Sequence, residues 1–178
     1  MHYGFIGLGH LGRFLAGSLL KAGFQVTVND LAPQNAETLI ASGARWAADP
    51  QAVAEQVDAV ITCLPSPKVS EAVLTGPRGI LAGLKSGGTW IEMSTLSSED
   101  VERLAAKAAE KGVRMMEAPV TGGVHKAASG EITVIAGGDK DLFELHKPAL
   151  QAMGGEIFHA GPLGKAAVIK VITNMLAF

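Results

Sequence analysis

The sequence predicts an α/β protein with a doubly wound, mostly parallel sheet, and three observations support this fold class. Short apolar runs alternate with longer segments of helical periodicity along the 178 residues. Glycine accounts for 22 residues and aromatic residues for only 5%, which is typical of chains with many tight turns between strands and helices. A glycine-rich turn also joins the first apolar run to the first helical segment. We therefore expect helices on both faces of the sheet.

Short apolar runs are expected to form the strands. Val26 and Val28 alternate with polar residues in one of them. The run over 58–64 is almost continuously apolar and stops at Pro65, as expected of a strand that is covered on both faces. In chain order, the expected strands span residues 3–6, 25–29, 44–46, 58–64, 88–92, 113–117, 132–136 and 156–159.

The expected helices begin and end at residues that favour helix termini. Pro33 opens one helix, and Gly43 follows its end. Asp49 is placed to cap another helix, which begins with Pro50. In chain order, we expect helices over residues 10–22, 33–42, from 50 onward, between 65 and 74, and over 97–111, 139–153 and 163–178.

The last expected helix, over 163–178, is apolar around most of its circumference, so it needs a surface that covers it. It could pack back on the sheet or form a dimer contact. We favour a third arrangement, in which the chain is the front part of a longer protein and stops inside this helix. The apolar residues concerned are Val168, Ile169, Val171, Ile172, Met175 and Leu176.

Charge and cysteine content exclude several functional classes. The net charge is −2, so the basic excess of a nucleic-acid or anionic-membrane binder is missing, and neither partner is expected. Cys63 is the single cysteine, which rules out an internal disulfide and a four-thiolate zinc site. We expect no metal. The sequence shows no signal peptide and no run of about 20 apolar residues, and we expect a cytoplasmic protein.

Residues 7–12 read Gly-Leu-Gly-His-Leu-Gly between an expected strand and an expected helix. In this setting Gly7 permits a tight turn, Gly9 lets the backbone approach a pyrophosphate, and Gly12 lets helix and strand pack closely. The helix start adds free N–H groups and a positive dipole end. The alternative is a glycine-rich turn that binds nothing. The predicted cofactor contacts here are Gly7, Leu8, Gly9, His10, Leu11 and Gly12.

Asp30 ends the second expected strand, 18 residues after Gly12. A carboxylate at this distance is placed to accept hydrogen bonds from ribose hydroxyls and to repel the 2′-phosphate of NADP. The next residues, Leu31 and Ala32, include no arginine that could pair with that phosphate. We therefore expect NAD as the cofactor, with NADP less favoured.

Three further segments lie at the carboxyl ends of expected strands, where ligands of open α/β sheets bind. Residues 63–67 and 93–95 lie at the ends of the strands expected over 58–64 and 88–92, and both segments could line the cofactor crevice. The alternatives are a plain strand-to-helix loop at 63–67 and a cap of the next helix by Thr95 or Ser97. Thr121 with Gly122 and Gly123 offers a hydroxyl and exposed N–H groups, which suit a carboxylate or phosphate oxygen. An ordinary Gly-Gly turn is the alternative.

Lys170 and Asn174 are four residues apart in a strongly apolar helix, so they share one face. A buried lysine is costly unless its pKa falls, and a lowered pKa makes it a usable acid and base. The alternative is that the Lys170 ammonium reaches solvent.

Taken together, these segments resemble the β-hydroxyacid dehydrogenase family, which includes 3-hydroxyisobutyrate dehydrogenase and tartronate semialdehyde reductase, and the resemblance covers the whole chain. It implies a Rossmann-type dinucleotide-binding domain over residues 1–162. It also implies that residues 163–178 begin an interdomain helix with the catalytic lysine, and that an all-helical second domain is absent from this chain.

The resemblance implies a role for each matching residue. Lys170 would be the catalytic acid and base, and Asn174 would orient the substrate. The substrate carboxylate would be held by Thr121, Gly122 and Gly123, and the cofactor would be contacted by Leu64, Pro65 and Thr95. The chain departs from the family pattern, which often has Ser at 121, Gly at 166 and Asn at 173. His125 and Lys126 are also unusual, and they could add positive charge near the substrate or lie on a solvated loop.

The implied activity is NAD-dependent oxidation of a small 3-hydroxy acid to its semialdehyde, or the reverse reduction, by a homo-oligomeric enzyme. One alternative is an NADP-dependent semialdehyde or imine reductase of the same fold. Asp30 argues against the phosphate, and Lys170 argues against the imine reductases that lack this lysine. Another alternative is a non-catalytic nucleotide-binding module. We expect the chain alone to bind dinucleotide but to turn over poorly.

Overall fold

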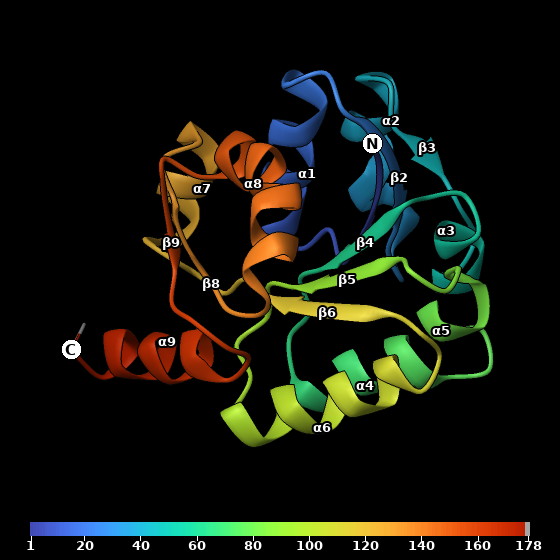
Figure 1. The fold of residues 1–178 in the computed structure, drawn as a ribbon. Coiled ribbons are helices and arrows are strands. Elements are labelled where there is room, and N and C mark those ends of the chain that lie inside the picture. The colour runs from blue at the N-terminus through green and yellow to red at the C-terminus, as the bar shows by residue number, and fades with distance from the viewer. Residues whose placement is uncertain (177–178) are drawn as a thin grey trace.

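In the computed structural model, which describes residues 1–176, the chain forms a six-stranded parallel sheet with helices on both faces and a smaller sheet beside it (Figure 1). The strand order in the large sheet is β3-β2-β1-β4-β5-β6. The order reverses between β1 and β4, and in open α/β sheets a crevice for ligands opens at that point, beyond the carboxyl ends of the strands. The predicted doubly wound α/β fold is confirmed.

The strands of the large sheet lie within the runs that the sequence predicts or within one residue of them. Pairing is parallel throughout, with Phe5 opposite Ile61 and Val60 opposite Trp90. The bounds are β1 His2–Ile6, β2 Gln25–Asn29, β3 Arg45–Trp46, β4 Ala59–Thr62, β5 Thr89–Glu92 and β6 Arg114–Glu117.

Both faces of this sheet are buried. Phe5, Ile61 and Ile91 belong to the core on the face covered by α1 (Gly12–Lys21) and α8 (Lys140–Met153). The neighbouring residues Val60 and Trp90 belong to the core on the other face. Figure 1 shows α1 and α8 on one side of the sheet and α4 (Pro67–Thr75) and α6 (Ser98–Ala109) on the other. This double burial explains the near-continuous apolar runs in the sequence.

Most helices also lie where the sequence predicts them. Asp49 caps α3 by accepting a hydrogen bond from the Ala52 amide at 2.9 Å. The helix expected over 33–42 divides into a 3-10 turn, η1, and a short α-helix, because the segment after Pro33 winds more tightly. The bounds are α1 Gly12–Lys21, η1 Pro33–Ala36, α2 Glu37–Ala41, α3 Pro50–Ala54, α4 Pro67–Thr75, α5 Ile80–Gly83, α6 Ser98–Ala109, α7 Gly123–Ser129, α8 Lys140–Met153 and α9 Lys165–Leu176.

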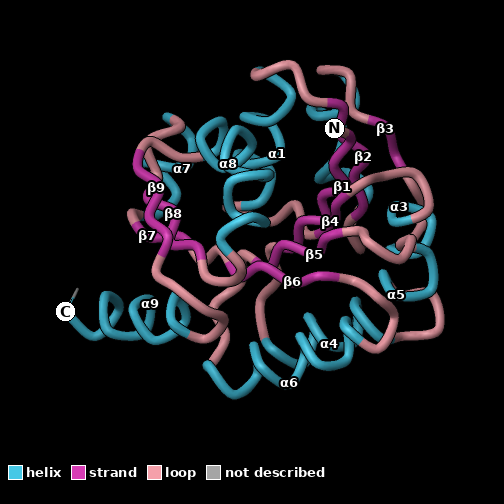
Figure 2. The backbone as a smooth tube through the Cα atoms, viewed as in Figure 1, coloured by secondary structure: helices cyan, strands magenta, loops and turns pink. Residues whose placement is uncertain are grey.

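The last strands form a separate sheet of order β7-β8-β9, with bounds Val120–Thr121, Thr133–Ala136 and Glu156–His159 (Figure 2). The β7–β8 pair is antiparallel and the β8–β9 pair is parallel. An isolated antiparallel bridge between Glu117 and Gly137 joins this sheet to β6. The sequence predicts β8 and β9 but not this division, because pairing partners are set by tertiary structure.

The helix at the end of the chain extends away from both sheets (Figure 1). Ala166 and Ala167 at its start are buried. Packing of the whole apolar helix on the sheet is therefore wrong: the six apolar side chains named in the sequence analysis expose between 40% and 79% of their surface. Residues 177 and 178 of the expected helix lie outside the described residues. Among residues 1–176, no helix has the length and hydropathy needed to span a membrane.

Candidate active site

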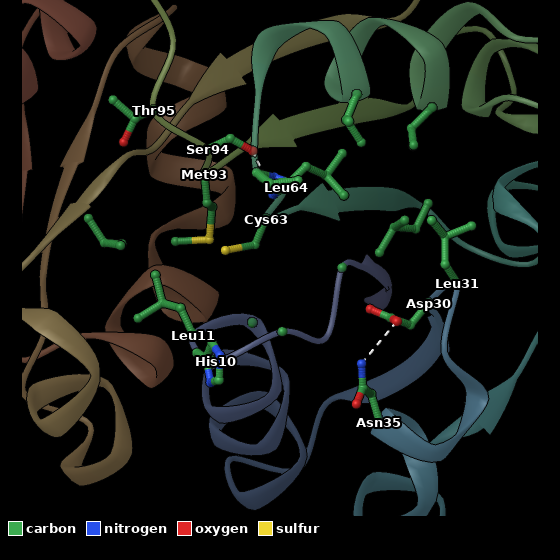
Figure 3. A pocket seen from close by; sticks show the side chains of 18 of the residues that line it. His10, Leu11, Asp30, Leu31, Asn35, Cys63, Leu64, Met93, Ser94 and Thr95 are labelled. Carbon is green, nitrogen blue, oxygen red and sulfur yellow. Dashed lines mark hydrogen bonds between the residues drawn. The ribbon is translucent and has the colours of Figure 1, made fainter.

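A cavity of about 760 Å³ opens at the carboxyl ends of the central strands, where the strand order reverses (Figure 3). The glycine-rich turn after β1, the end of β2, the loops after β4 and β5, the start of α7 and Lys170 of α9 all contribute to its wall. The predicted site residues among its lining are Gly7, Gly9, His10, Leu11, Gly12, Asp30, Leu64, Pro65, Thr95, Gly123 and Lys170.

The glycines of the turn have different steric surroundings. A Cβ on Gly7 would collide with the carbonyl oxygen of Cys63, and a Cβ on Gly12 would collide with the carbonyl oxygen of Gly7. Gly7 also has a φ of 97°, a value that favours glycine. Apart from its chain neighbours, no atom of residues 1–176 lies within 4 Å of where a Cβ on Gly9 would be, so this glycine faces open space. The turn is therefore closely packed behind and open in front, which fits a pyrophosphate at the start of α1.

Asp30 is fixed at the rim of this cavity by three donors. Its carboxylate accepts hydrogen bonds from the Leu8 amide at 2.6 Å, the Ala32 amide at 2.8 Å and the Asn35 side chain at 3.0 Å. Figure 3 shows the bond from Asn35. The bond from Leu8 ties the carboxylate to the glycine-rich turn. Leu8 itself is buried and lies outside the cavity lining, and Asn35, which the sequence analysis missed, belongs to the lining.

The loops after β4 and β5 are connected by Ser94. Its hydroxyl accepts a hydrogen bond from the Leu64 amide at 2.7 Å, and its own amide donates to Glu92 Oε1 at 2.8 Å. Glu92 is buried, and this burial raises its pKa while the bonds from Ser94 lower it in part. Burial, with a contribution from Glu92, raises the pKa of the Cys63 thiol to about 12, so this cavity-lining cysteine is protonated at neutral pH.

Lys170 reaches the cavity from α9, and burial lowers the pKa of its ammonium. An apolar environment favours the neutral amine, which can accept a proton. The structure thus brings a potential base to the same cavity as the glycine-rich turn. Among residues 1–176, no group of three or more His, Cys, Asp and Glu side chains is placed to hold a metal ion.

Three predicted substrate residues lie outside the cavity lining. Thr121 is half-buried at the end of β7, and Gly122 follows it with a φ of 125°. Asn174 is exposed on α9, one turn beyond Lys170. His125 and Lys126 are exposed on α7, and the aliphatic stem of Lys126 lies over Gly122, 2.8 Å from where a Cβ would be.

Sequence reasoning missed several residues of the wall. Asn35 gave no signal because it lies in η1, a 3-10 turn that the sequence did not predict, and this turn brings its side chain to Asp30, five residues earlier. Val120 and Ile132 line the cavity from the small sheet and its flank, which the sequence did not place beside the glycine-rich turn. Ser94 lies in a segment singled out as a strand end, and its hydroxyl at that position was the available signal.

Comparison with known proteins finds a matching family model and relatives that align with nearly the whole chain. The family model described as the NAD binding domain of 6-phosphogluconate dehydrogenase matches residues 2–161. The chain is 40% identical over 172 residues to NAD-dependent L-serine dehydrogenase of Pseudomonas aeruginosa and 37% identical over 173 residues to 2-(hydroxymethyl)glutarate dehydrogenase of Eubacterium barkeri. Each alignment covers 97% of this chain and 58% of the relative, so the chain spans little more than half the length of these relatives.

A solved structure has the same fold over nearly the whole chain. Mycobacterium tuberculosis 3-hydroxyisobutyrate dehydrogenase, determined with L-serine, superposes on 99% of this chain with a TM-score of 0.93 and 32% sequence identity. The superposition covers 60% of that protein's chain. The likeness therefore extends over both sheets and α9.

Proposed function

The chain belongs to the family of NAD-binding domains of the 6-phosphogluconate dehydrogenase type, and from this premise we propose that its parent protein is an NAD-dependent 3-hydroxyacid dehydrogenase. The reaction is oxidation of a small 3-hydroxy acid to its semialdehyde, or the reverse reduction. One observation carries this proposal: Lys170, the glycine-rich turn and Asp30 line one cavity. The names of the relatives support the same class of substrate.

The cofactor half of the cavity is suited to a dinucleotide without a 2′-phosphate. NAD, when bound, supplies the hydride acceptor for the carbinol carbon. The turn around Gly9 and the start of α1 hold the pyrophosphate through backbone N–H groups. Asp30 accepts hydrogen bonds from ribose hydroxyls, and its negative charge disfavours NADP. Leu64, Pro65 and Thr95 form the opposite wall.

The proton is handled by Lys170. In the neutral form that burial favours, Nζ accepts the proton of the substrate hydroxyl, and in the reverse direction the ammonium returns it. Thr121, Gly122 and Gly123 hold the substrate carboxylate through a hydroxyl and backbone N–H groups, with Gly123 at the cavity wall. Asn174, one helical turn from Lys170, orients the substrate.

We assign residues 1–162 to the dinucleotide-binding domain and residues from 163 to the start of an interdomain helix. The exposed apolar side chains of α9 and the greater length of the relatives support a second domain in the parent protein, which the family resemblance implies to be all-helical. The resemblance further implies that the parent protein is a homo-oligomer. The single cysteine is compatible with a cytoplasmic location.

Calorimetric titration of the chain with NAD and with NADP tests the cofactor assignment. NAD is expected to bind more tightly than NADP, and Asp30→Ala is expected to weaken NAD binding by about tenfold, since a charge-assisted hydrogen bond is lost. Tighter binding of NADP would favour the NADP-dependent reductase instead. Binding of neither dinucleotide would contradict the assignment.

Turnover of a panel of 3-hydroxy acids by the parent protein tests the chemistry. Lys170→Ala is expected to lower kcat by at least about a hundredfold and to leave NAD binding unchanged, because general acid–base catalysis contributes on the order of 10²–10⁴-fold. Undiminished turnover by this variant would contradict the role of Lys170. NAD binding without turnover of any hydroxy acid would identify a nucleotide-binding module.

A further inference from the structure

Glu117 is a buried carboxylate to which the proposed chemistry gives no role. It ends β6, and only 1% of its surface is exposed. Its backbone makes both hydrogen bonds of the bridge to Gly137, at 3.0 and 2.9 Å. A Cβ on Gly137 would collide with Glu117 Oε1, so the side chain passes directly over this glycine. The bridge and this close contact thus restrict the directions in which the carboxylate can point.

The Glu117 carboxylate points toward the first turn of α9. Oε1 accepts a hydrogen bond from the Ala166 amide at 3.1 Å, and Oε2 accepts one from the Ala167 amide at 2.9 Å. The first amides of a helix have no partner within the helix, and an anion next to them also interacts favourably with the helix dipole. Burial raises the pKa of Glu117, whereas the amide bonds lower it. The carboxylate therefore serves as a helix cap from about 50 residues earlier in the chain.

Lys170 lies one turn beyond this cap. Ala166 and Lys170 are four residues apart, so they share the face of α9 that turns toward the domain. Ala166 and Ala167 are buried, while most of the following residues are exposed. The capped turn is thus the main attachment of α9 to the domain. Its position determines where the Lys170 side chain enters the cavity.

We propose that Glu117 is a positioning residue for Lys170, and that its two hydrogen bonds to the start of α9 fix the helix and hold Nζ in the cavity. Glu117 is not among the cavity-lining residues, so it does not act on substrate or cofactor directly. Its carboxylate accepts hydrogen bonds from the amides of Ala166 and Ala167, so Glu117 acts through the helix and not as a charge beside the amine. The inference rests on the proposed function only where it concerns turnover.

The test compares Glu117→Gln with Glu92→Gln. Glutamine has the size of glutamate, but its NH₂ group would face an amide N–H of α9 and could not accept from it. Glu92 is equally buried and pairs with Glu117 in the register of β5 and β6, yet its hydrogen bond goes to Ser94 and not to α9. The second variant therefore controls for the loss of a buried carboxylate.

Two measurements on the chain without substrate decide the structural part. Relative to the other slowly exchanging amides of the chain, hydrogen exchange at residues 166–170 is expected to accelerate at least about tenfold in Glu117→Gln and not to accelerate in Glu92→Gln. The NMR titration of Lys170 is expected to move toward that of an exposed lysine in Glu117→Gln alone, because the side chain leaves its half-buried position. Unchanged exchange in α9, or equal acceleration throughout the chain, would overturn the proposal.

Turnover by the parent protein decides the functional part. In Glu117→Gln, kcat is expected to fall at least about tenfold while the Kd for NAD stays within about twofold, since the glycine-rich turn is untouched. Parallel loss of kcat and NAD affinity would overturn a positioning role. If the wild-type protein oxidised no 3-hydroxy acid, the proposed function would fail, but hydrogen exchange and the Lys170 titration would still decide whether Glu117 holds α9.

Discussion

Glu92 shows how one buried side chain connects the core to the cofactor cavity. It accepts a hydrogen bond from Ser94, which in turn holds the amide of Leu64. Among residues 1–176, its other oxygen, Oε2, has no hydrogen bond of good geometry, and neither has the hydroxyl of nearby Ser70. A buried carboxylate with an unpaired oxygen destabilises the fold whenever it is ionised. Glu92 thus orders this wall of the cavity but destabilises the fold by an amount that depends on pH.

Glu92→Gln is expected to stabilise the chain above neutral pH. The pKa of Glu92 is raised in the folded state, so the stability that its protonated form contributes is fully present below the ordinary pKa of 4.5. This contribution is lost as pH rises through the folded pKa. Glutamine does not titrate, and its amide can donate to Ser70. Urea unfolding at pH 8 should give a free energy of unfolding about 1–2 kcal/mol higher for the variant. A gain equal at pH 4 and pH 8 would contradict this explanation.

At the scale of elements, the contact between β1 and α1 depends on Gly12. Because a Cβ at this position would meet the carbonyl oxygen of Gly7, Gly12→Ala must displace the helix from the glycine-rich turn. We expect a loss of stability of about 1–3 kcal/mol and at least tenfold weaker NAD binding. Gly9→Ala is the matched control, since its Cβ enters open space. It should weaken NAD binding with little change in the midpoint of thermal unfolding. Equal destabilisation by both variants would contradict the steric argument.

The same scale shows what the sequence can predict. Strands such as β4 were predictable because a double-sided core demands a continuous apolar run, and the cap of α3 was predictable because Asp49 acts locally. The short elements α5 and β7 were not, since their few residues depend on tertiary contacts. For the site, Asp30 and Leu64 were predictable because ligands of open α/β sheets bind beyond the carboxyl ends of the strands. The cap from Glu117 to α9 was not, because it joins residues far apart in the chain and leaves no local pattern.

At the scale of the whole molecule, two buried polar arrangements lie at opposite ends of the large sheet. The one around Glu92 and Glu117 is at the carboxyl ends of the strands, beside the cavity. The other joins α8 to the amino-terminal ends of β1 and β5: His146 Nδ1 lies 2.9 Å from the Tyr3 hydroxyl, and Nε2 lies 3.0 Å from the Thr89 hydroxyl. The first arrangement orders the cavity wall and holds the start of α9, whereas the second attaches α8 to the sheet.

This second arrangement makes the stability of the domain sensitive to acid. Burial, with a smaller effect of Arg114, lowers the pKa of His146 to about 4 from an ordinary value of 6.5. Above pH 6.5 the histidine is neutral in both states, and its contribution is fully present. Between pH 6.5 and pH 4 only the unfolded state takes up the proton, so up to about 3 kcal/mol of stability is lost as pH falls.

Urea unfolding between pH 4 and pH 7 checks this expectation with His146→Gln. Glutamine keeps a donor and an acceptor near Tyr3 and Thr89 but does not titrate, so the variant should be less stable than the wild type at pH 7 and should approach it at pH 4. Burial also lowers the pKa of His2, and both proteins retain this residue, so its effect cancels in the difference between the two curves. A constant difference from pH 7 to pH 4 would mean that His146 fastens α8 without making the fold sensitive to acid.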